Sequence, residues 1–219
     1  MGAVLGDLLP LAVGVAISPI PIVAVILMIL SKNAGGAAKG FALGWVAGIL
    51  LVTAVLTLLS GSLGDSGDGD PPVAVSWIKI VLGALLIVLA IKQWRDRGDT
   101  AVPGWMQAID TITTGKSIGL GALLSAVNPK NLLLCVSAGV VIGGAGLSGA
   151  GDVVAVVIYT LLASSVVLSV VIGYTVAAQR FAPALNSARQ WLQDNNHIVM
   201  AIVLIIMGAV VVGKGIGGL

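Results

Sequence analysis

Two long apolar stretches of this chain are each interrupted near the middle by a proline motif. The first stretch covers residues 8–30 and contains Ser-Pro-Ile-Pro at 18–21. The second covers residues 118–142 and contains Asn-Pro-Lys-Asn at 128–131. Ser or Asn before Pro is typical of a helix start, because the polar side chain caps the first turn and Pro fits there without an N–H. Each stretch therefore predicts one membrane-length segment made of two half-helices.

The composition places the whole chain in a membrane. It is 58% hydrophobic and only 9% charged, whereas soluble domains carry about 25% charged residues, and the mean hydropathy is +1.12. No basic face suited to nucleic acid is present. A bilayer core needs about 20 apolar residues per helix, and six segments near this length follow one another: 8–30, 37–60, 74–92, 118–142, 153–177 and 197–213. The predicted class is an all-α polytopic membrane protein with six transmembrane helices.

The six predicted spans divide into two groups of three. We predict a first three-helix repeat at residues 1–97, a cytoplasmic linker with an interfacial helix at 98–117, and a second three-helix repeat at 118–219. Because three is odd, the two repeats have opposite orientation. Ser18 and Asn128 each lie about 10 residues inside their spans, which is about 15 Å at 1.5 Å per residue, half of a bilayer core. Helices 1 and 4 are thus predicted to break at one common depth.

The basic residues predict the orientation, since Lys and Arg gather on the cytoplasmic side. Those in the first, third and fifth loops are Lys32, Lys39, Lys92, Arg95, Arg97, Lys116, Arg180 and Arg189. The second and fourth loops hold none; Lys214, just beyond the last span, is the mild exception. We therefore predict a multi-pass protein of the cell (inner or plasma) membrane with both termini outside.

The two breaks form the candidate substrate site. Proline removes a backbone donor, and backbone groups freed in hydrocarbon must be buried against protein or line a cavity. Two half-helix N-termini would point their positive dipole ends at the midplane, where Lys130 is the only charge deep in a span. These features favour an anionic group such as phosphate, sulfate or carboxylate. The candidate residues are Ser18, Pro19, Pro21, Asn128, Pro129, Lys130 and Asn131. Alternatively, a fourth span that begins near Asn131 leaves Lys130 at the cytoplasmic surface.

Other small and polar residues in the spans have a simpler interpretation. Gly40, Gly44 and Gly48 repeat the G-x-x-x-G spacing that lets two helices approach closely, which favours packing over substrate contact. The hydroxyl residues of the fifth span, Thr160 to Thr175, are likewise assigned mainly to packing and secondarily to a pathway lining. The spans lack acidic residues, and the chain has one histidine and one cysteine. We therefore predict no enzyme activity, no cofactor and no metal site.

Several stretches resemble one known family. SPIPIVAVILMILS at 18–31, FALGW at 41–45 and GLGALLSAVNPKNLLL at 119–134 are similar to the glycolipid-addressing, or sulfolipid-addressing, proteins of actinobacteria. This resemblance implies a place in the lysine-exporter superfamily of six-span carriers. It also implies export of an amphipathic lipid or glycolipid to the actinobacterial cell envelope. The two proline motifs fall on the motif positions of that family.

Three hypotheses follow. The first is a lipid or glycolipid transporter with a midplane, anion-favouring site. The second is an exporter of small solutes such as amino acids, as the wider superfamily implies. The third is a non-transporting scaffold that assembles with a larger lipid-export complex. The glycine-lined helix faces are also compatible with a homodimer.

Overall fold

The described part of the chain is helical. The computed structural model describes residues 1–31, 34–64, 73–98 and 108–219, and these contain helices and no strand. The elements are α1 (Gly2–Ala16), α2 (Pro19–Leu30), α3 (Ala34–Gly64), α4 (Val73–Arg95), η1 (Asp96–Gly98), η2 (Ala108–Thr111), α6 (Thr114–Ala126), α7 (Pro129–Gly143), α8 (Gly149–Asp194) and α9 (Asn196–Ile216). The predicted all-α class is confirmed.

Among these helices, the long apolar ones give the membrane-spanning framework. Four segments can cross a bilayer by length and composition: Gly35–Gly61, Val75–Gly98, Gly149–Val176 and Asn196–Ile216. Two further pairs qualify when each is taken together, α1 with α2 and α6 with α7. The first pair is bent by 51° and the second by 65°. The chain is therefore a multi-pass membrane protein with four to six candidate spans in its described part.

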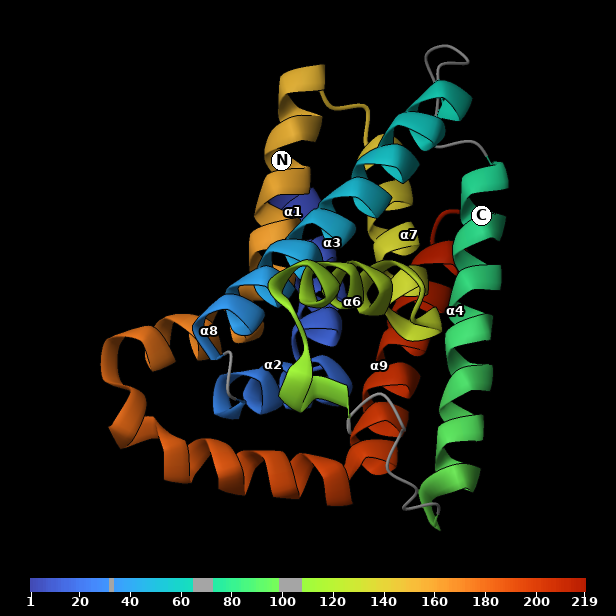
Figure 1. Ribbon diagram of the computed structural model, residues 1–219. Coiled ribbons are helices and arrows are strands. Elements are labelled where there is room, and N and C mark those ends of the chain that lie inside the picture. Colours follow the sequence, from blue (N-terminus) through green and yellow to red (C-terminus); the bar gives the residue numbers. More distant parts are fainter. Residues whose placement is uncertain (32–33, 65–72, 99–107) are drawn as a thin grey trace.

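Helices that pack against each other are often far apart in the sequence (Figure 1). α4 lies along α9 at one edge, α3 packs against α6 and α7, and α8 packs against α1, α2 and α3. Gly44 shows why α3 and α6 can meet closely. A Cβ atom at Gly44 would stand 2.8 Å from the carbonyl carbon of Ile118 and 3.0 Å from the nitrogen of Ala122. The assignment of this glycine to helix packing is confirmed.

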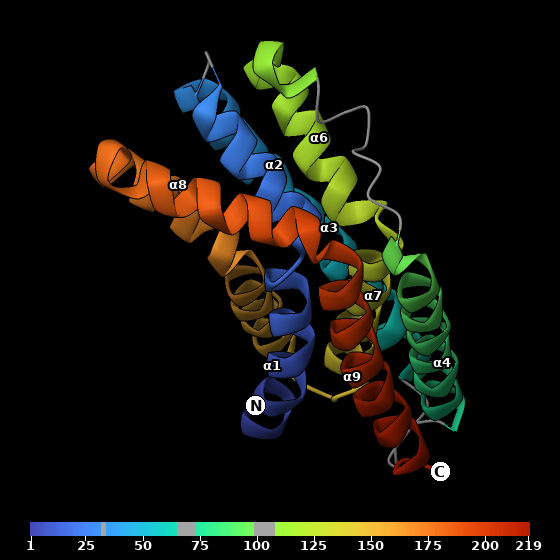
Figure 2. The ribbon, with the colours of Figure 1, turned by 90° about the horizontal axis from the view of Figure 1, so that it is seen from below.

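Polar contacts show which chain segments share an end of the bundle. Asp7 forms an ion pair with Lys214, with 2.5 Å between carboxylate and ammonium. Ser76 Oγ donates a hydrogen bond of 2.8 Å to the carbonyl of Gly218. The two chain termini and the start of α4 therefore lie together, and Figure 2 shows both termini along one edge. We call this the termini end.

The opposite end of the bundle is marked by a contact between α4 and α9. Gln93 Oε1 lies 2.7 Å from His197 Nδ1, where α4 finishes and α9 begins. The last part of α8 runs toward this same contact, as the orange and red ribbon along the lower edge of Figure 1 shows. We call this the linker end.

α8 corrects one sequence prediction. We expected the fifth span to end near residue 177 and a separate polar segment to follow at 179–196. The structure has one helix, Gly149–Asp194, which turns along the linker end after its membrane-length part (Figure 1). Pro183 lies within it. Leu185, on the expected apolar face, packs against the core, so amphipathic packing carries the helix on past the apolar segment.

The second half of the chain begins with α6. α6 begins at Thr114, inside the predicted linker 98–117, because Thr113 caps it by accepting from Lys116 N at 3.4 Å. Trp105 and Met106 of the predicted interfacial helix lie outside the described residues, whereas Ile109 lies in the short helix η2 and is buried. The domain boundaries stay predictions.

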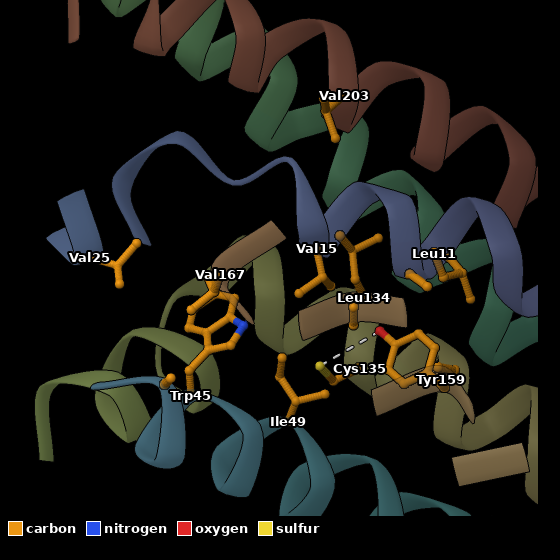
Figure 3. Packing of buried hydrophobic residues seen from close by; sticks show 14 of the residues in the cluster. Leu11, Val15, Val25, Trp45, Ile49, Leu134, Cys135, Tyr159, Val167 and Val203 are labelled. Atoms are coloured by element: carbon orange, nitrogen blue, oxygen red, sulfur yellow. Dashed lines mark hydrogen bonds between the residues drawn. The ribbon is translucent and has the colours of Figure 1, made fainter. Parts of the chain in front are cut away.

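The core lies where both halves meet. Its largest buried side chains include Trp45 and Phe41 of α3 and Tyr159 of α8. Figure 3 shows Tyr159 beside Cys135 of α7, where its hydroxyl donates to Sγ at 3.7 Å. Side chains from both halves thus form one continuous core.

Candidate functional site

The two proline breaks lie against each other. Ser18 Oγ donates a hydrogen bond of 2.9 Å to Asn131 Oδ1, and Lys130 Nζ donates one of 2.9 Å to Ser18 Oγ. These residues are more than 100 positions apart in the sequence. The structure thus brings together Ser18, Lys130 and Asn131, three of the seven predicted site residues, into one polar cluster. We call it the break cluster.

The second break is built as a capped helix start. Asn128 Oδ1 accepts from Lys130 N at 3.1 Å, and Pro129 occupies the first helical position of α7. Asn131 Nδ2 donates at 3.1 Å to the carbonyl of Leu124 in α6. That carbonyl belongs to the last turn of α6, whose carbonyls lose their helical partners at the break. At this break, the side chains of Asn128 and Asn131 therefore bond to backbone groups that the interrupted helix leaves without partners.

The first break works differently, and here the capping prediction is wrong. Ser18 stands at the N-cap of α2 but its side chain makes no capping hydrogen bond. Pro19 and Pro21 bring no N–H to the first turn, and Ile22 N donates to the Ser18 carbonyl at 3.3 Å. The first turn of α2 therefore has few free N–H groups that a capping side chain could bond. The Ser18 hydroxyl is consequently available to the second break.

The break cluster holds a deeply buried lysine. Lys130 is only 2% exposed, so its side chain lies inside the protein; its depth in the membrane stays a prediction. Within the described ranges no carboxylate forms an ion pair with it, and its side-chain partner is the neutral hydroxyl of Ser18. A buried charge is costly unless it is paired and hydrogen-bonded. The cluster therefore has one lysine amine and no carboxylate partner for it among the described side chains.

Beside the second break lies a cavity of about 350 Å³. Its apolar lining comes from α2, α6, the break and α9: Ile20, Leu123, Leu124, Val127, Pro129 and Met200. Its two polar lining residues are Gln93 at the end of α4 and Asn128. Since Gln93 contacts His197, the cavity lies toward the linker end. We call it the break cavity.

Sequence analysis missed one candidate residue, Trp45. Its side chain is fully buried, and its indole Nε1 has no hydrogen-bond partner among the described residues. Figure 3 shows this nitrogen turned toward Val15, which precedes the first break, and Leu134, which follows the second. The available signal was position, since Trp in membrane helices prefers the interface and this one lies well inside a span.

Two hydroxyl residues of α8 bond the backbone of their own helix. Thr160 Oγ1 donates to the carbonyl of Val156 at 2.8 Å, and Thr175 Oγ1 to that of Ile172 at 2.7 Å. This supports the packing interpretation for both threonines. Ser164 differs, because its buried Oγ has no partner in the described part of the chain.

A comparison with known protein families shows which family the chain belongs to. The family model described as Sap, sulfolipid-1-addressing protein, matches residues 8–217. The chain belongs to the sulfolipid-1-addressing protein family. The expected resemblance is thereby confirmed, and the family description connects the chain with sulfolipid addressing. No curated protein and no solved structure matches it. Membership of the lysine-exporter superfamily stays a prediction.

The family match takes in both breaks, the break cavity and Trp45. The structure places Pro19, Pro21, Asn128 and Pro129 as the framework of the two helix starts. It places the side chains of Ser18, Lys130 and Asn131 in direct contact. Their role in substrate binding stays a prediction for this member of the sulfolipid-1-addressing family.

Proposed function

We propose that this protein moves an anionic glycolipid of the cell envelope, of the sulfolipid type, across the cell membrane. One observation carries this proposal: Lys130 is buried, donates to Ser18 across the two breaks, and has no carboxylate partner in the described residues. A sulfolipid bears a fixed negative charge on its sulfur-containing group. That group would supply the counter-charge that the break cluster lacks.

The proposal includes a specific membrane arrangement. α1 with α2, and α6 with α7, are each one broken span, so the chain has six spans in two inverted three-helix repeats. α2 has 12 residues and α7 has 15, which correspond to about 18 and 22 Å at 1.5 Å per residue. Both are shorter than a bilayer core of about 30 Å. The breaks, and Lys130 with them, then lie near the midplane.

The electrostatics of the break favour an anion for two reasons. An ammonium in a low-dielectric site attracts an opposite charge far more strongly than it would in water. The N-termini of α2 and α7 also begin at the breaks, so their positive dipole ends add to the field of Lys130. A sulfate, sulfonate or phosphate group matches both features.

The basic residues support an orientation in which the linker end is cytoplasmic and the termini end is outside. Lys92 and Arg95 lie at the linker end of α4, in keeping with the preference of Lys and Arg for the cytoplasmic side. Lipid would thus pass from the linker end toward the termini end. We further propose that the chain performs no covalent chemistry and works without a cofactor, as a homodimer or in a larger lipid-export complex.

Reconstituted protein tests the proposal directly. Vesicles would contain a fluorescent sulfated glycolipid, and the fraction reaching the opposite leaflet would be measured with a membrane-impermeant quencher. Lys130→Met should slow this movement about tenfold or more, since loss of a charged hydrogen bond to the anionic headgroup costs more than about 1.4 kcal/mol of binding. Lys92→Met is the matched control, because Lys92 is exposed, and should move lipid normally. Movement at the wild-type rate in Lys130→Met would show that the proposed site is wrong.

The two other functions remain distinguishable in the same preparation. Efflux of labelled amino acids without lipid movement would replace the proposal by a solute exporter. Purified protein that moves neither, yet co-purifies with a larger lipid exporter from its host, would replace it by a scaffold. The break cavity favours the lipid proposal, since its lining is mainly apolar.

A further inference from the structure

We infer that the break cavity binds an acyl chain of the transported lipid, which reaches it sideways from the bilayer between α6 and α9. This inference deepens the proposed function and rests on it. The break cluster would hold the charged headgroup, while the break cavity would hold an apolar part of the same molecule.

The chemistry of the lining excludes most other occupants. Six of the eight lining side chains are apolar, and the remaining two, Gln93 and Asn128, are neutral amides. A free amino acid or an inorganic anion would leave its charge without a partner there. A volume of about 350 Å³ lies within the usual range for ligand pockets, and a hydrocarbon chain suits such a lining.

The position of the cavity explains how a chain could enter it. Leu123 is 54% exposed and Val127 is 61% exposed, and both lie on the broken helix pair α6–α7 within the apolar part of the protein. Residues exposed at this level face lipid in a membrane. Met200 of α9, only 4% exposed, lies on the inner side. The lining therefore runs from a lipid-exposed rim to a buried wall.

The cavity and the break cluster are joined through consecutive residues. Asn128 and Pro129 line the cavity, and Lys130, the next residue, turns its ammonium to Ser18 on the other break. Ile20 lines the cavity two positions after Ser18. The cluster residues do not line the cavity themselves, so a molecule with its chain in the cavity would place its headgroup beside the second break, next to the cluster along the chain. Figure 2 shows the helices that supply this lining, α2, α4, α6, α7 and α9.

Photo-crosslinking tests the inference. The whole protein would be placed in phosphatidylcholine vesicles with a phosphatidylglycerol probe that carries a diazirine on one acyl chain. Labelled peptides would be mapped by mass spectrometry after irradiation. We expect labelling to concentrate at 123–129 and at Met200. Labelling spread evenly over exposed bilayer-facing residues, such as Leu85 and Leu161, would overturn the inference.

Two tryptophan substitutions provide matched variants. Leu123→Trp fills the rim of the cavity, whereas Ile202→Trp enlarges an α9 side chain that is similarly exposed, at 49%, but does not line it. We expect Leu123→Trp to lower labelling of Met200 about tenfold, equivalent to 1.4 kcal/mol of binding, and Ile202→Trp to leave it unchanged. Val127→Trp provides a second rim variant should Leu123→Trp fold poorly. Equal labelling in rim and control variants would contradict the inference.

Failure here differs from failure of the proposed function. If Lys130→Met stops lipid movement but the probe never labels the cavity, the cluster is functional and the acyl-chain site is wrong. If the cavity is labelled but Lys130→Met moves lipid normally, the cavity binds lipid and the proposed headgroup site is wrong.

Discussion

The two breaks of this protein each have a polar residue followed by proline, but their side chains make different hydrogen bonds. At the first, Ser18 contributes one hydroxyl and leaves the start of α2 without a side-chain cap. At the second, Asn128 caps α7, Lys130 contributes the cation, and Asn131 both holds a freed carbonyl and accepts from Ser18. The first break thus contributes one hydroxyl to the break cluster, and the second contributes the cap, the lysine and the amide.

This difference follows from where prolines stand. Two prolines in the first turn of α2 remove donors that would otherwise need a cap, so Ser18 can turn to its neighbour. α7 has proline only at its first position, so its second N–H needs Asn128. At the first break, the Ser18 side chain therefore makes no local capping bond and bonds to the second break instead. Variants at each break should separate these two roles.

The largest expected effect is at Lys130. Replacing it by methionine removes an uncompensated buried charge and keeps a long apolar side chain. We expect the free energy of unfolding in detergent to rise by about 1–4 kcal/mol, the range found when buried ionic groups are replaced by apolar ones. Thermal unfolding of the lipid-free protein would measure this. A lower unfolding temperature than wild type would mean that the cation is compensated after all.

Ser18→Ala should have the opposite sign. It removes the side-chain partner that Lys130 Nζ has among the described residues and the donor to Asn131 Oδ1. A buried group left without its partner costs about 1–3 kcal/mol, so the unfolding temperature should fall. Ser18→Ala in a Lys130→Met background should cost clearly less, and this double-mutant cycle tests whether the two residues are coupled. Additive losses would show that they are not.

Asn128→Ala tests the local role of the second break. Loss of an N-cap side chain typically costs about 1 kcal/mol, and we expect that loss here. The double variant with Ser18→Ala should be additive at this position, because no hydrogen bond joins Asn128 to Ser18. Chemical denaturation in mixed micelles would provide the values. No loss in Asn128→Ala would mean that Pro129 alone sets the helix start.

Trp45→Phe should produce the smallest structural change. It removes the N–H that has no partner in the described residues and keeps most of the aromatic packing. We expect stability to change by less than about 1 kcal/mol, since no hydrogen bond is lost. A several-fold slower lipid movement at unchanged stability would place Trp45 in the headgroup path. Normal movement would assign it to packing alone.

Sequence reasoning reached the helical class and a helix start at each proline motif, because proline and hydropathy act locally. The two broken spans and the inverted repeats stay predictions. Sequence reasoning also identified Lys130 as the charge of interest. It could not show that Ser18 bonds across the bundle, since capping and cross-bonding use the same hydroxyl and only packing decides between them. The missed Trp45 and the uninterrupted α8 have the same origin. Whether a buried donor lacks a partner, and whether a helix continues past its apolar part, depends on packing against residues that are distant in the sequence.

The hydrogen bond from Lys130 to Ser18 also fixes an order of events during synthesis. Ser18 leaves the ribosome 112 residues before Lys130, and a lone hydroxyl is inexpensive to leave in lipid. The costly ammonium arrives second, when its oxygen partner has already been inserted. In a chain with the two halves exchanged, Lys130 would be inserted before Ser18 and would have no hydroxyl partner at that time. The order of the two breaks along the chain therefore places the hydroxyl in the nascent protein before the lysine that bonds to it.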